Sequence, residues 1–238
     1  MKFVLLNESK VSDAAHGGHL TPAILGKIAA ESTTYLNQYV AAYWGGVGTH
    51  VVRAGAGKTD VHAGEIVCAI VDALPDAPDA VAYHDVAGKE VPVVFLARVQ
   101  CNSLMSGPDS VSSALSHELA ETVGDPACNL WARDTRYEWA HELCDAVQEW
   151  GFEIDGVAMS DFVLPAFFAP GSAGPWNYLG TKSAETALKS ALAPAPGGYQ
   201  IRSSAGGHEV QVEGMIPEAH LARKRSWSSR TYRRGVRL

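Results

Sequence analysis

The stretch SHELAETVGDP, residues 116–126, is the most specific pattern in this 238-residue chain, and it predicts the second helix of the fold. Ser110 supplies a capping hydroxyl, so we expect the helix to begin near Ser110 and to run through SSALSHELAETV to Gly124. On such a helix His117 and Glu121 project from the same face, with Glu118 about 100 degrees round the axis. An imidazole nitrogen and a carboxylate oxygen can therefore reach one cation.

The end of this helix offers a further carboxylate. Gly124 permits a left-handed helix end, and Pro126 forces Asp125 out of the helical region into an extended conformation. Asp125 then either points back at the cation as an alternative ligand or caps the turn. We favour the cap.

A second acidic pattern, YEWAHELCDAV, follows at residues 137–147. We expect a third helix over about Tyr137 to Trp150, with a buried side that carries Trp139, Leu143 and Val147. Four polar residues fall at i, i+3, i+4 and i+7 on its other face: Glu138, His141, Glu142 and Asp145. Such a run forms either a solvated acidic face or part of a metal site.

The remaining patterns predict a mixed α and β protein. FVLLN near the start is typical of a strand, and Thr21-Pro22 predicts the start of a helix that ends at Gly45-Gly46. Four β-branched runs then predict strands of one sheet: THVVRA, EIVCAIVDA, AVAYHDV (with His84 as a strand residue) and VPVVFLAR. From Phe162 onward, Pro, Gly and aromatic residues predict a long ordered loop followed by a late strand.

Composition excludes several classes of protein. A hydrophobic fraction of 47% argues against disorder. The apolar run at the start is too short for a signal peptide, and the longest uncharged apolar run, Ile66 to Val71, is far below the ~20 residues that span a bilayer. The four cysteines form no C-x-x-C pair, which favours reduced thiols in a cytoplasmic setting.

Charge separates the tail from the rest of the chain. Residues 219–238 hold seven of the 19 Lys and Arg and no Asp or Glu, so the preceding residues combine 12 basic with 26 acidic side chains. We expect this basic arm to dock onto an acidic protein surface, in an assembly or a homo-oligomer, with nucleic acid as the alternative partner. Its partner-binding residues are Arg223, Lys224, Arg225, Arg230, Arg233, Arg234 and Arg237.

The chain resembles a family of zincin-like proteins found in bacteriophages and bacterial genomes. The resemblance covers roughly residues 20–202, and its most specific pieces are H-E-L-x-E-x-x-x-D-P and the later E-L-C-D. Other matching segments are YVAAYWGG, AYHD, VPVVF, FEIDGVAMSDFVLPAFF and GGYQI. It implies a metallopeptidase-like α+β fold, with a mixed sheet packed on an N-terminal helix and on an active helix that bears the first motif.

The resemblance also implies roles for individual residues. In zincins two histidines of H-E-x-x-H hold zinc, whereas here the second is Glu121, which makes the site a degenerate H-E-x-x-E. A downstream glutamate completes the site of thermolysin-like zincins, and Glu142 has that spacing. The implied roles are therefore His117, Glu121 and Glu142 as ligands, Glu118 as general base, and Asp145 as the group that orients a ligand or joins the metal.

These residues define two hypotheses of different classes. The first is a phage-type zincin-like metal-binding protein that hydrolyses peptides with zinc, although two carboxylates leave bound water less acidic and also suit Mn or Ca. The second is a virion structural component of a head or tail, which docks through its arm without catalysis. Both divide the chain into a metal-binding domain (1–160), a packed loop region (161–205) and an arm (206–238), located in the host cytoplasm or the virion.

Overall fold

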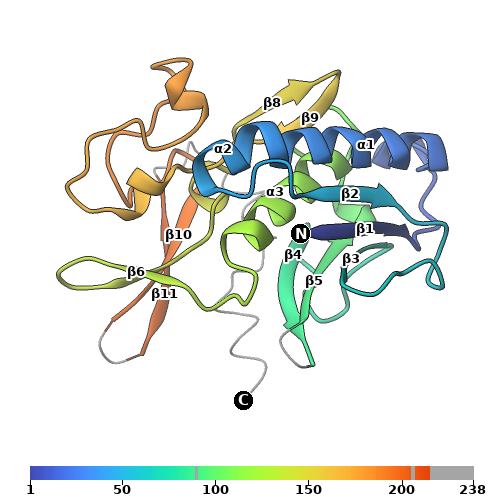
Figure 1. The fold of residues 1–238 in the computed structure, drawn as a ribbon, viewed down its shortest axis with the longest axis horizontal. Coiled ribbons are helices and arrows are strands. Elements are labelled where there is room, and N and C mark those ends of the chain that lie inside the picture. Colours follow the sequence, from blue (N-terminus) through green and yellow to red (C-terminus); the bar gives the residue numbers. More distant parts are fainter. Residues whose placement is uncertain (89–90, 205–206, 215–238) are drawn as a thin grey trace.

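The computed structural model describes residues 1–88, 91–204 and 207–214, and its largest element is a five-stranded mixed sheet (Figure 1). The strand order is β2-β1-β3-β5-β4. The strands are Lys2–Asn7 (β1), Val51–Ala54 (β2), Glu65–Val71 (β3), Ala82–Ala87 (β4) and Val91–Ala97 (β5). The first three and β5 run parallel, whereas β4 pairs antiparallel with β5 at the edge. The expected mixed α+β class and all five sheet strands are confirmed.

The N-terminal helix covers the sheet (Figure 1). It begins with Pro22–Thr34 (α1), where the Thr21 hydroxyl accepts a hydrogen bond from the Ile24 amide. A π-helical segment, Tyr35–Val40, continues it into Ala41–Trp44 (α2). Gly45 then ends the helix with a φ of 86°, a conformation that glycine adopts without strain. The expected start and end are both confirmed.

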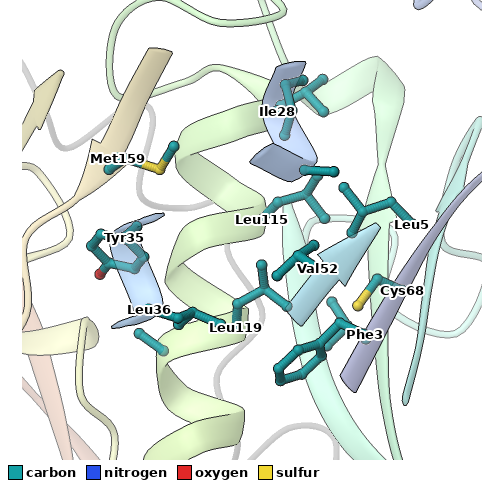
Figure 2. Packing of buried hydrophobic residues seen from close by; sticks show 14 of the residues in the cluster. Phe3, Leu5, Ile28, Tyr35, Leu36, Val52, Cys68, Leu115, Leu119 and Met159 are labelled. Carbon is teal, nitrogen blue, oxygen red and sulfur yellow. The ribbon is translucent and has the colours of Figure 1, made fainter. Parts of the chain in front are cut away.

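The central helix, Val111–Gly124 (α3), lies against the sheet and begins where the sequence predicts, because the Ser110 hydroxyl accepts a hydrogen bond from the Ser113 amide. Figure 2 shows Leu115 and Leu119 pointing from α3 into the core. Their neighbours come from the strands and the N-terminal helix and include Phe3, Leu5, Val52, Cys68, Ile28, Tyr35 and Leu36. This burial fixes the rotation of α3 and leaves its polar face for a site.

The expected third helix is wrong. Trp131–Arg133 (β6) and Glu138–Ala140 (β7) form a hairpin, and Asp145–Val147 form a short 3-10 turn. The Asp134 carboxylate closes the hairpin loop by accepting hydrogen bonds from the Arg136 and Tyr137 amides. Strand β7 also pairs with Tyr199–Ser203 (β10), some sixty residues later. Long-range strand pairing therefore overrides the helical spacing of the acidic residues.

The C-terminal part combines short strands and ordered loops. Gly151–Ile154 (β8) and Val157–Ser160 (β9) form a hairpin, and Glu209–Glu213 (β11) completes the sheet β11-β10-β7-β6. Further 3-10 turns span Ala14–His16, Arg98–Gln100, Pro165–Phe168 and Leu179–Thr181. Aromatic side chains anchor the long loop, as expected: the Phe162 and Tyr178 rings stack 5.3 Å apart. The late strand is confirmed as β10.

Three further expectations concern the basic arm, membrane-spanning helices and the cysteines. Of the predicted arm (206–238), residues 207–214 contain β11, whereas residues 215–238, with the seven Lys and Arg, lie outside the described residues, so the partner of the arm stays a prediction. Within residues 1–88, 91–204 and 207–214, no helix is both long enough and apolar enough to cross a membrane. The four cysteines are free thiols.

Candidate metal centre

The polar face of α3 brings its motif residues to one cleft. Because Leu115 and Leu119 are buried in the core, His117, Glu118 and Glu121 face the other way. These three residues line a cleft that encloses about 680 Å³, its open mouth included. The rest of the lining comes from residues 80–82, which lead into β4, and from Pro108, Asp109, Ser113, Ala114, Asp145, Gln148 and Tyr199.

A first group of donor atoms converges at His117. Its Nε2 lies 3.2 Å from Glu121 Oε1 and 3.2 Å from Asp145 Oδ1, and the three donor atoms lie within 4.8 Å of one another. Ligands held tetrahedrally at ~2.0–2.1 Å from zinc are separated by about 3.3 Å. The spacing of this group therefore suits a bound cation at its centre.

Asp145 joins this group from a 3-10 turn and not from the helix that the sequence predicts. Its 3-10 turn lies beside α3, and the Cys144 amide donates a hydrogen bond of 3.1 Å to Glu121 Oε1. Gly124 allows the close approach: a Cβ at this position would lie 2.3 Å from Leu143 Cδ1. Gly124 is the last helical residue and is not among the positive-φ residues, so the expected left-handed end is wrong. Its role is to admit the Leu143 side chain.

The carboxylate of Asp125 caps the loop after α3. It accepts hydrogen bonds from the amides of Asn129, at 3.0 Å, and Leu130, at 2.8 Å. The residue has left the helical conformation, with a φ of -145° and a ψ of 74°, as expected before Pro126, but it does not adopt the extended conformation. The structure therefore gives Asp125 the cap that the sequence favours over a ligand role.

A second group of donor atoms centres on His84, which the sequence places only as a strand residue. His84 is buried on β4, and its Nδ1 lies 3.2 Å from Glu118 Oε2 and 3.4 Å from Glu121 Oε2. Its Nε2 lies 3.9 Å from Glu142 Oε2. Burial opposes the charged imidazole, but hydrogen bonds to Cys128 and Glu118 raise the pKa of His84 well above its usual value. The available signal was a histidine on the same face of the strand as the apolar Ala82 and Val86.

In the first group, His117 likewise interacts electrostatically with the carboxylates of Glu121 and Asp145. Burial opposes a charged imidazole, but the charge of Glu121 and a hydrogen bond to Asp145 raise the pKa of His117 well above its usual value. Despite burial, His117 lowers the pKa of Glu121 well below its usual range. Burial and the charge of Glu121 raise the pKa of Asp145 to about 7. The carboxylates around His84 and His117 thus stabilise positive charge on the two imidazoles, and a metal ion that binds these nitrogens must displace a proton.

The sequence-predicted residues are therefore largely brought together. His117, Glu118 and Glu121 lie on one face of α3, and Asp145 contributes an oxygen to the His117 group. Glu142 is buried nearby beside His84, and its assignment as third ligand stays a prediction. The described residues thus contain His, Glu and Asp groups that could hold a metal ion.

Comparison with known proteins adds no further identification. No family model, no curated protein and no solved structure matches this chain. The resemblance to zincin-like proteins and the link to bacteriophages therefore remain predictions from the sequence.

Proposed function

We propose that this protein binds a divalent cation through His117, Glu121 and Asp145 and uses it to hydrolyse peptides, as a zincin-like enzyme with a degenerate H-E-x-x-E site. One observation carries this proposal: the three donor atoms converge within 4.8 Å at the wall of an open cleft. The motif order, with the base position directly after the first ligand, supports the zincin assignment.

Zinc is the proposed metal because one imidazole and two carboxylates are all ligands that zinc accepts. The two carboxylates would balance the charge of a divalent ion, so a water on that ion would lose its proton less readily than on zinc held by histidines alone. Hydrolysis should therefore be slow, and Mn or Ca should also bind, since both prefer oxygen ligands.

Glu118 is the proposed general base. It lines the cleft and is only 8% exposed, so its carboxylate is shielded from bulk water while remaining next to the metal ligands. A base must lie within hydrogen-bond reach of the water that it deprotonates. The position of Glu118 on α3, one residue after His117, supports this role.

Strand β4 supports a peptide as the substrate class. Among the described strands β4 forms one of the two edges of the five-stranded sheet, beside β5, and Val81 and Ala82 line the cleft. An exposed edge can accept an extended peptide as an added strand through backbone hydrogen bonds. Such a peptide would cross the cleft beside the proposed metal ligands.

The test combines zinc binding with hydrolysis. Titration calorimetry should show zinc binding by the wild type and a large loss of affinity in His117→Ala. Hydrolysis of a mixed peptide library, followed by mass spectrometry, should disappear in Glu118→Gln while its first zinc is retained. Zinc binding with no cleavage under any condition would refute the catalytic role and would favour the virion structural alternative.

A further inference from the structure

The His84 group is a second set of cation ligands beside the proposed first site. His84 Nδ1, Glu118 Oε2 and Glu121 Oε2 belong to two elements, β4 and α3, and lie within 4.8 Å of one another. The His84 side chain is only 2% exposed, and its Nδ1 points at both carboxylates. Two glutamates of this group also line the cleft, which gives ions a route from solvent.

The carboxylate of Glu121 joins the two groups. Its Oε1 lies 3.2 Å from His117 Nε2, and its Oε2 lies 3.4 Å from His84 Nδ1. A carboxylate that presents one oxygen to each of two sites is the usual bridge between paired cations ~3.5–4 Å apart. The Glu121 side chain is only 4% exposed and its Oε1 accepts a hydrogen bond from the Cys144 amide, which holds this orientation.

Charge balance points in the same direction. Four buried carboxylates surround two imidazoles, and the ion pairs described above join them to His84 and His117. The carboxylates belong to Glu118, Glu121, Glu142 and Asp145. When both imidazoles act as neutral ligands, four negative charges remain in a buried region, where uncompensated charge is costly. One divalent cation at the first site balances two carboxylates, and a second at the His84 group balances the other two once the His84 imidazole acts as a neutral ligand.

We propose that His84, Glu118 and Glu121 form a second divalent-cation site, with Glu121 as the bridge. This inference rests on the proposed function, because the bridge requires a cation at the first site. A cation at the second site takes the Glu118 carboxylate, which lies 3.2 Å from His84 Nδ1, as a ligand. Glu118 then no longer serves as a base, so the second cation inhibits the hydrolysis that the first supports.

The test is cation stoichiometry on the full chain. Zinc titrations, with bound metal measured by mass spectrometry, should give two equivalents for the wild type, one tight and one weaker. His84→Gln should bind one. Glu118→Gln, which changes the same site from another element, should also bind one. His50→Gln is the matched control, since His50 is buried but lies away from the cleft, and it should bind two.

A second readout reports the distance between the ions. With Mn²⁺ as the probe, electron paramagnetic resonance of the wild type should show a spin-coupled pair, and folded His84→Gln should show an isolated ion. Saturation of the wild type at one equivalent, lost in His117→Ala, would overturn the second site and leave the proposed function intact. Two equivalents retained in both His84→Gln and Glu118→Gln would also overturn it. No binding by the wild type would refute both.

Discussion

Gly124→Ala tests how the helix and the Asp145 turn are joined. An added Cβ would lie 2.3 Å from Leu143 Cδ1, 2.8 Å from Cδ2 and 3.1 Å from Cγ. Leu143 is fully buried, so its side chain has no open space into which to move. Overpacking of this kind costs ~1–3 kcal/mol, against a gain of at most ~1 kcal/mol in helix propensity. We expect a net loss of about 1–2 kcal/mol in the free energy of unfolding.

Urea unfolding of the metal-free protein measures this loss. Gly26→Ala is the control, because Gly26 lies inside α1 with open space around its missing Cβ, and it should be neutral or stabilising by up to ~1 kcal/mol. Leu143→Ala alone should cost ~2–5 kcal/mol, and the double variant should cost less than the sum by the energy of the clash. Additive effects, or a Gly124→Ala protein as stable as the wild type, would refute the packing argument.

Three further outcomes are expected. Zinc at 100 times its Kd should raise the unfolding free energy by ~2.7 kcal/mol in a thermal-shift assay, and an equal rise in His117→Ala would contradict the ligand assignment. Asp125→Ala should cost ~1–3 kcal/mol, because two amides lose their acceptor, without changing zinc stoichiometry; a lost zinc would make Asp125 a ligand. Burial raises the pKa of Asp161 to about 6, above ~3.9 in the unfolded chain, so this residue contributes up to about 3 kcal/mol of stability below pH ~4 that is lost as pH rises through 6. Asp161→Asn should remove this part of the pH profile of urea unfolding, and an unchanged profile would exclude Asp161 as its source.

The sequence predicted correctly those helices and strands whose formation depends on neighbouring residues in the chain. Ser110 and Thr21 cap helices through their own hydroxyls, and the β-branched runs had no competing pattern, so α1, α3 and the five-stranded sheet agree with the sequence. The polar face of α3 followed from helical geometry alone. These features depend on residues within a few positions of one another.

The prediction of a third helix was wrong because the structure of this segment depends on residues far away in the sequence. Its acidic spacing matched a helix, but β7 pairs with β10, and nothing near Trp139 in the sequence shows that distant pairing. As a result, Glu142 and Asp145 do not lie where a helix would have put them. Asp145 lies on a 3-10 turn next to α3 and contacts His117, whereas Glu142 lies near His84. Their spacing after Glu121 could not distinguish these positions.

His84 was missed because its role depends on sheet order. A strand residue reaches α3 only if its strand lies at the right edge and its side chain points to the helix side of the sheet. The antiparallel pairing of β4 with β5, in which His84 lies opposite Val94, sets both conditions. The sequence predicts that strand but not its place in the sheet.

The most direct test of the metal centre is anomalous diffraction at the zinc edge from zinc-loaded crystals of the full chain. We expect a peak ~2.0–2.2 Å from His117 Nε2, Glu121 Oε1 and Asp145 Oδ1. A folded, zinc-loaded protein with no peak between these three atoms would contradict it.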